Sequence, residues 1–127
     1  MKGVVSMNPK QRLDRACLAL CRQIVFIRAD NKCQCGCGRA AQDPSHIINR
    51  DRKNTRYFLD NQVALSRVCH DHARPKELKA RHIKIIGQAK YDFLEALSKE
   101  YKCWRENDLK ILKSDLTEIL KNSKEVK

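Results

Sequence analysis

The chain has 127 residues, a length that suits one domain with a modest core and is short for two. Its 27 Lys and Arg against 15 Asp and Glu give a formal net charge of +12 at pH 7, which favours an anionic partner such as nucleic acid, although a solvated basic surface has the same composition. No segment approaches the roughly 20 apolar residues of a membrane span, and residues 1–11 lack a signal-peptide pattern, so we expect a cytoplasmic protein with no membrane partner.

The N-terminal part is expected to contain one helix. Residues 1–10 are expected to form a loose leader, and apolar side chains then recur every three or four positions over 11–29, which predicts an amphipathic helix. Cys17 and Cys21 lie one turn apart on its apolar face. They could form half of a metal site, but small buried thiols are the preferred interpretation.

Residues 31–74 favour turns and short extended pieces, and they contain two clusters of potential metal ligands. The ligands are Cys33, Cys35, Cys37, Cys69, His70 and His72. The chain has seven cysteines, an odd number, and in a protein expected inside the cell these are more often thiols or metal ligands than disulfides. Zinc prefers four Cys or His ligands taken from two close-spaced turns, so we expect a structural Zn²⁺ site; unligated thiols are the alternative.

Residues 75–121 are expected to be helical. Pro75 suits a first turn, and an apolar stripe continues to Lys102, with Gly87 either weakening this helix or marking a break. A further stripe over 106–121 belongs to the core or to the contact of a homodimer, and the polar residues 122–127 are expected to fray. Together these elements predict a single α+β domain that is mostly helical.

Several short motifs follow one another in a fixed order between Asn31 and Leu97. They are Cys37-Gly38-Arg39, Ser45-His46, Arg56-Tyr57, Asp60-Asn61, Cys69-His70-Asp71-His72, Ile86-Gly87-Gln88 and Asp92-Phe93-Leu94-Glu95. The order His46, Asn61, His70 inside a cysteine-rich frame resembles the HNH, or ββα-metal, endonuclease superfamily. Within it the chain is most similar to phage NinG-type recombination proteins.

This resemblance implies a ββα-metal motif with a zinc-stapled knuckle, flanked by one N-terminal and two C-terminal helices. His46 would be the general base, since a neutral imidazole suits that task near pH 7. Asn61 would aim the His46 ring by amide hydrogen bonds. His70 would bind a single divalent ion, Mg²⁺ or another, that stabilises the charge developing on the phosphate.

The resemblance also implies a metal-dependent DNA endonuclease that hydrolyses phosphodiester bonds in phage recombination or DNA processing. Its substrate would be branched, single-stranded or duplex DNA in the host cytoplasm. Four basic side chains after the proposed base would hold flanking phosphates without reading sequence, or form only a solvated loop. They are Arg50, Arg52, Lys53 and Arg56.

Two positions depart from the family pattern. Many HNH enzymes have an acidic metal ligand at the position of Ser45, so activity would depend on another carboxylate. The candidates are Asp43, Asp51 and Asp71. Ser66 stands where the family has a zinc-binding cysteine, and a fourth ligand must join Cys33, Cys37 and Cys69. His72 is the preferred candidate and Cys35 is its rival.

Two other functions remain open at this stage. A non-catalytic zinc-stapled module could bind DNA or RNA with the same basic surface, and Ser45 favours this alternative. A structural or regulatory zinc protein could instead bind a partner protein through its C-terminal helices.

Overall fold

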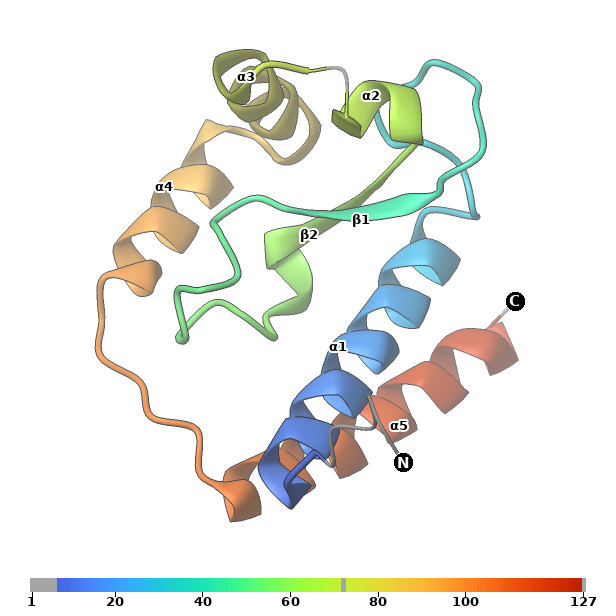
Figure 1. The fold of residues 1–127 in the computed structure, drawn as a ribbon. Coiled ribbons are helices and arrows are strands. Elements are labelled where there is room, and N and C mark those ends of the chain that lie inside the picture. Colours follow the sequence, from blue (N-terminus) through green and yellow to red (C-terminus); the bar gives the residue numbers. More distant parts are fainter. Residues whose placement is uncertain (1–6, 72, 127) are drawn as a thin grey trace, which may run out of the picture.

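The computed structural model describes residues 7–71 and 73–126, and it confirms an α+β fold that is mostly helical (Figure 1). The elements in chain order are α1 (Pro9–Arg28), β1 (Asp43–His46), the 3₁₀ helix η1 (Leu59–Asn61), β2 (Gln62–Leu65), α2 (Arg67–Asp71), α3 (Pro75–Ile86), α4 (Gln88–Ser98) and α5 (Glu106–Val126). None of the helices within the described ranges is long and apolar enough to cross a lipid bilayer.

Helix α1 begins before the expected boundary at residue 11. Asn8 caps it, because the Asn8 side chain accepts from the backbone N–H of Gln11 and the Gln11 side chain accepts from the backbone N–H of Asn8. Pro9 occupies the first turn, where its missing N–H costs nothing. The leader expected over 1–10 is therefore wrong for residues 9 and 10, and residues 1–6 lie outside the described ones.

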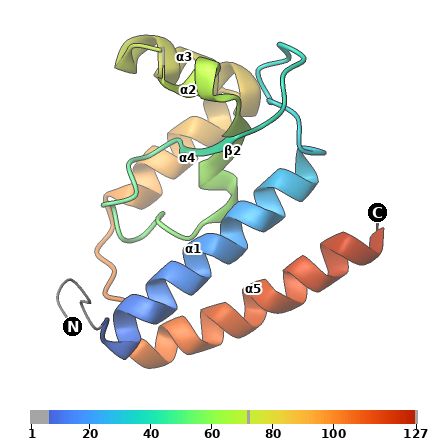
Figure 2. The same ribbon diagram turned by 45° about the vertical axis from the view of Figure 1, so that its right-hand side comes forward.

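Helices α1 and α5 run side by side in the same direction (Figure 2). Their shared core contains Cys17, Cys21, Ile24, Tyr57, Leu109, Leu116 and Leu120. The fraying expected from residue 122 is wrong for residues 122–126, which continue α5. This stretch contains neither Gly nor Pro, and the Ser123 hydroxyl donates to the Ile119 carbonyl one turn earlier, so nothing ends the helix after Leu120.

The expected helix over 75–102 is divided in two. Gly87 has φ +93°, a conformation that side chains with a Cβ rarely adopt, and it separates α3 from α4. Helix α4 ends at Ser98, and an extended linker leads from there to α5. Of the two possibilities raised for Gly87, the structure therefore shows a break.

The strands β1 and β2 form a two-stranded antiparallel sheet in which Asp43 lies opposite Leu65 and His46 lies opposite Gln62. All four residues of β2 are buried, and α2 follows this strand after Ser66. A second core of buried side chains, smaller than the first, joins the sheet to the segment before it. Its members are Cys33, Val63, Leu65 and Cys69.

Candidate functional site

Four cysteines gather between the segment before β1 and helix α2. The Sγ atoms of Cys33, Cys35, Cys37 and Cys69 all lie within 4.8 Å of one another. Cys35 Sγ is 3.2 Å from Cys33 Sγ and 3.2 Å from Cys69 Sγ, and Cys69 Sγ is 3.7 Å from Cys37 Sγ. A tetrahedral zinc ion with Zn–S bonds of ~2.3 Å separates its sulfurs by ~3.8 Å. The group could therefore hold a structural metal ion such as zinc.

Backbone geometry brings the first three of these cysteines together. Gly36 and Gly38 both have φ +85°, so the chain turns sharply on each side of Cys37. The Cys33 N–H donates to the Arg39 carbonyl at 2.9 Å and closes the turn. Ser66 supplies a cap in place of a ligand, since its hydroxyl accepts from the Cys69 N–H at 3.2 Å.

Cys35, the rival for the fourth position, lies in this group with the three cysteines expected from the sequence. His72, the preferred fourth ligand, lies outside the described residues. The structure thus gives a set of four ligands without His72, and all four are thiols.

The thiols differ in how readily they ionise. The Arg39 backbone N–H lowers the pKa of exposed Cys37 to about 6, while burial and the neighbouring thiols raise the pKa of Cys35 to about 12. Burial disfavours the Cys33 thiolate, but backbone hydrogen bonds from Ser66 and Cys35 outweigh it and lower the Cys33 pKa. Metals bind thiolates, so the lowered pKa of Cys37 favours metal binding near neutral pH.

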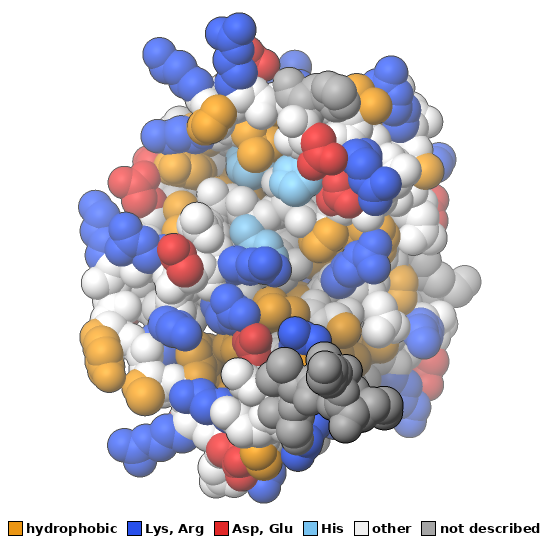
Figure 3. All heavy atoms as spheres, viewed as in Figure 1, with side chains coloured by type: hydrophobic (Ala, Val, Ile, Leu, Met, Phe, Trp, Pro, Cys, Tyr) orange, Lys and Arg blue, Asp and Glu red, His pale blue; other side chains and the backbone are white. Residues whose placement is uncertain are grey.

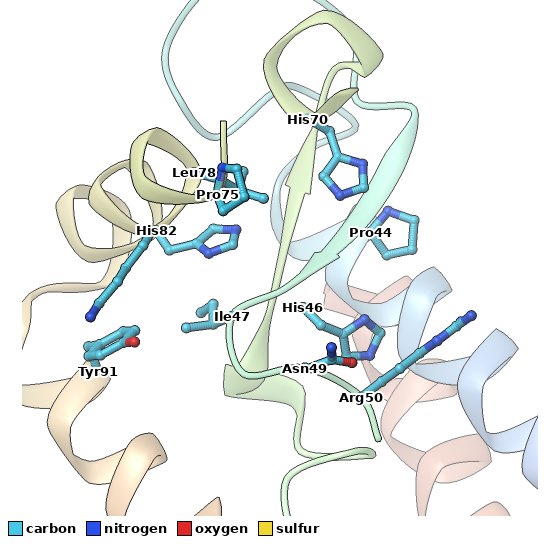
Figure 4. A pocket seen from close by; sticks show the side chains of 11 residues that line it. Pro44, His46, Ile47, Asn49, Arg50, His70, Pro75, Leu78, His82 and Tyr91 are labelled. Atoms are coloured by element: carbon cyan, nitrogen blue, oxygen red, sulfur yellow. The ribbon is translucent and has the colours of Figure 1, made fainter. Parts of the chain in front are cut away.

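A separate hollow of about 610 Å³ lies beside β1, and three histidines line it. We call it the histidine hollow; its lining includes His46, His70 and His82, together with Arg50, Lys79 and Tyr91. In Figure 4, His70 points from α2 toward β1, His82 points from α3 into the same space, and Arg50 extends past the His46 ring. Figure 3 shows the histidines in the upper half of one face, with acidic and hydrophobic side chains directly beside them and Lys and Arg side chains below and to the sides.

His46 ends β1 and has a ring nitrogen without a partner. Its Nε2 is buried and has no hydrogen-bond partner among the described residues. The Arg56 backbone forms a hydrogen bond with the His46 side chain. Burial, then the charges of Arg50 and Arg56, lower the His46 pKa to about 4. The ring is therefore neutral at physiological pH, and with this pKa it is a weaker base than an ordinary imidazole.

Asn61 is fully buried and fixes the loop that follows His46. Its side chain accepts from the Ile48 N–H at 2.8 Å and donates to the carbonyls of Ile48 at 3.0 Å and Thr55 at 3.2 Å. These bonds use the whole amide and hold both ends of the basic segment between them. Asn61 thus fixes this loop from within, next to the end of β1.

A second group of potential metal ligands lies where β1 meets α2. It consists of Asp43, His70 and Asp71, with one ligand atom from each within 4.8 Å of the others. His70 Nδ1 is 3.4 Å from an Asp43 oxygen and 3.5 Å from an Asp71 oxygen. Two of the three carboxylates considered as replacements for the missing acid thus lie beside His70. The third, Asp51, lies in the exposed loop and is not part of the group.

Ser45 and His82 form a buried pair beneath the histidine hollow. Ser45 Oγ lies 2.7 Å from His82 Nε2, and burial lowers the His82 pKa to about 4. Sequence periodicity placed His82 in an apolar helix stripe and missed this contact. The sequence did contain a signal for it: a histidine at a core-facing position of a helix is buried, and a buried histidine needs a hydrogen-bond partner.

The four basic residues after His46 do not have equal freedom. Arg50 lines the histidine hollow, and Arg52 and Lys53 are exposed. Arg56 is instead held by Asp14 of α1, with Nε and Nη2 each 2.8 Å from a carboxylate oxygen. We therefore assign Arg56 to anchoring the loop, and the sequence offered no signal for its pairing with a residue 42 positions away.

Comparison with protein-family models, with curated proteins and with solved structures finds no match for this chain. Function is therefore inferred from the geometry of these two groups and the hollow beside them.

Proposed function

We propose that this protein is a metal-dependent nuclease of the HNH type that hydrolyses phosphodiester bonds in DNA. One observation carries the proposal. A neutral histidine with an unpartnered ring nitrogen, His46, and the group of Asp43, His70 and Asp71 are both presented by one strand–strand–helix unit. His46 and His70 line the same hollow.

In this proposal His46 Nε2 takes the proton of the attacking water, while the Arg56 backbone and Asn61 hold the ring and its loop in place. Two carboxylates and one imidazole suit a hard divalent ion such as Mg²⁺ or Mn²⁺. Such an ion stabilises negative charge on the phosphate and the leaving oxygen. Arg50 and Lys79 line the hollow and can bind the phosphates on either side.

The four-cysteine group has a different task in this proposal. Four thiolates close the coordination shell of a zinc ion and leave no position for a substrate, as in structural sites. Zinc there would tie α2, and with it His70 and Asp71, to the segment before β1. Cysteines that must stay reduced to bind zinc suit a protein that acts in the reducing cytoplasm.

A non-catalytic zinc module that binds nucleic acid is the second candidate. It is favoured by Ser45, which cannot supply a negative charge and whose hydroxyl is already bonded to His82. This candidate keeps affinity for nucleic acid and loses nothing when His46 is replaced.

A cleavage assay separates the two. Zinc-loaded wild type and His46→Ala are incubated with single-stranded, duplex and branched DNA, with and without Mg²⁺ or Mn²⁺. We expect metal-dependent cutting that falls at least about a hundredfold in the variant, the usual contribution of a general base, with unchanged zinc content. Binding without cutting, equal in both proteins, would establish the second candidate. The three substrate shapes test the relation to phage recombination.

A further inference from the structure

The linker between α4 and α5 reaches the N-terminal end of α1 (Figures 1 and 2). Residues of both segments line a second hollow, of about 470 Å³. We call it the tyrosine hollow; its lining includes Lys10, Lys53, Tyr101, Lys102 and Trp104. Of the residues given a part in cutting or in metal binding above, it is lined by Arg56, whose backbone holds the His46 ring, and it shares no proposed metal ligand.

The basic loop after β1 connects the two hollows. Arg50 lines the histidine hollow and Arg56 lines the tyrosine hollow. Arg56 Nη1 donates to the Arg50 carbonyl at 2.9 Å, so the two positions are tied together across the loop. A nucleic-acid strand bound at His46 would therefore have to cross only this one loop, which carries Arg52 and Lys53, to reach the tyrosine hollow.

The tyrosine hollow is positively charged. Its one acidic lining residue among those described is Asp14, which accepts two hydrogen bonds from Arg56 and one from the Tyr57 hydroxyl. Within the described part of the chain, Lys10, Lys53 and Lys102 form no ion pair. Three lysines thus remain to attract an anion.

The aromatic rings of the hollow differ in freedom. Trp104 is a fixed wall, because its Nε1 donates to the Lys53 carbonyl at 2.8 Å and its ring meets Tyr57 edge-on with centroids 5.0 Å apart. Lys102 Nζ lies 4.5 Å from the Trp104 centroid. Tyr101 is 91% exposed and no aromatic or cationic contact covers its ring in the described structure.

We propose that the tyrosine hollow binds an unpaired stretch of nucleic acid, with a base stacked on Tyr101 and phosphates held by the three lysines. An exposed ring beside lysines is the arrangement by which proteins hold single strands, since every unpaired base offers a face for stacking. Paired bases in a duplex do not offer that face. This inference rests on the proposed function for the identity of the ligand, and it adds a second contact on the same strand.

The test is fluorescence anisotropy with a labelled oligothymidylate of about 12 nucleotides, within the usual site size of single-strand-binding domains. Zinc-loaded protein is used without added Mg²⁺, so that no cutting is needed. Tyr101→Ala is expected to weaken binding about tenfold, and Tyr101→Phe, which keeps the ring, is expected to bind like wild type. An abasic oligomer of equal length should bind wild type and Tyr101→Ala alike.

Lysine variants supply the charge control. Lys102→Gln should reduce the slope of log affinity against log salt by about 0.7, the value for one phosphate contact on a single strand. Lys121→Gln, an exposed lysine of α5 outside the hollow, should leave that slope unchanged.

Unchanged affinity of Tyr101→Ala, or equally tight binding of a duplex of the same sequence, overturns the inference. Neither result bears on cutting by His46, which the cleavage assay decides separately. Conversely, Tyr101-dependent binding by a protein that never cuts DNA supports this site and counts only against the nuclease.

Discussion

At the scale of single residues, Ser45 stands where many HNH enzymes have an acidic metal ligand, and its hydroxyl is hydrogen-bonded to His82 instead. Both residues are buried, with 1% of Ser45 and 2% of His82 exposed. Side chains alternate along a strand, so Asp43 lies on the same face of β1 as Ser45, two positions earlier. The HNH pattern would have a carboxylate at position 45, and Asp43 supplies one on the same face of β1 two positions earlier. There it meets His70 from α2.

This shift predicts that Asp43 matters more than Asp51, although both carboxylates were equal candidates from the sequence. Asp43→Asn is expected to lower affinity for Mn²⁺ at least about tenfold, the loss already seen when a residue that only orients a ligand is removed. Titration calorimetry on zinc-loaded protein measures it. Asp51→Asn is the matched control, and equal affinities in the two variants would remove Asp43 from the group.

His82 predicts how stability depends on pH. Burial lowers its pKa from the ordinary 6.5 to about 4, so the unfolded chain takes up this proton first as the pH falls. The free energy of unfolding should therefore decrease between pH 6.5 and about 4, with no contribution from this group above that window. Urea unfolding across the range measures the slope.

Gln in His82→Gln keeps a hydrogen-bond partner for Ser45 but cannot titrate. The slope of unfolding free energy against pH should therefore be smaller in this variant, by an amount that corresponds to at most one bound proton. Any effect of acid on the cysteines is shared by both proteins and cancels in the comparison. Identical slopes in the two proteins would mean that His82 has an ordinary pKa in the folded state.

At the scale of elements, the loop between β1 and η1 is held from three sides despite its charge. Asn61 fixes it from within, Arg56 ties it to Asp14 of α1, and the Asn54 amide donates to the Leu97 carbonyl at the end of α4. A basic segment of this kind would repel itself if free. Its fixed position lets Arg50 face one hollow while Arg56 faces the other.

Asn61→Ala should therefore loosen this loop. It leaves three backbone groups of Ile48 and Thr55 without their partner, which costs roughly 2–4 kcal/mol of unfolding free energy. Urea denaturation measures the loss. Asn49→Ala is the control, because exposed Asn49 accepts only one long bond of 3.3 Å from the Asp51 N–H. A similar small change in both variants would contradict the anchoring role.

The elements also show what the sequence could reveal. Periodicity located α1 and α5 because each helix has an apolar stripe that packs on the other. Cysteine spacing located the four-cysteine group. The meeting of Asp43 with His70 could not be predicted, since it depends on where α2 sits against β1. Helix ends were missed where the deciding signal was a cap at Asn8 or the absence of any stop after Leu120.

At the scale of the whole molecule, the two cores differ in strength. The α1–α5 core buries several large side chains, whereas the core around β2 has two of its four buried members supplied by cysteines. The cysteines of this second core belong to the group that could hold a metal ion, and such an ion would add to the stability of this region on binding.

Cys35→Ser is accordingly expected to lose zinc and to lower the melting temperature by about 10 °C or more. Metal analysis and thermal unfolding measure the two effects. Cys103→Ser is the matched control, because Cys103 is exposed and lies outside the four-cysteine group. Normal zinc content in Cys35→Ser would assign the fourth position to another residue, with His72 the first to test.

The pairing of α1 with α5 has a consequence for synthesis of the chain. The thiol of Cys17 in α1 donates to the carbonyl of Leu109 in α5, a partner 92 residues further along. On the ribosome, the part of α1 that α5 covers is therefore made long before its partner, while β1, η1 and β2, which also contact α1, are already available. Such distant contacts also slow folding. We therefore expect the contacts of α1 with β1, η1 and β2 to form before those of α1 with α5.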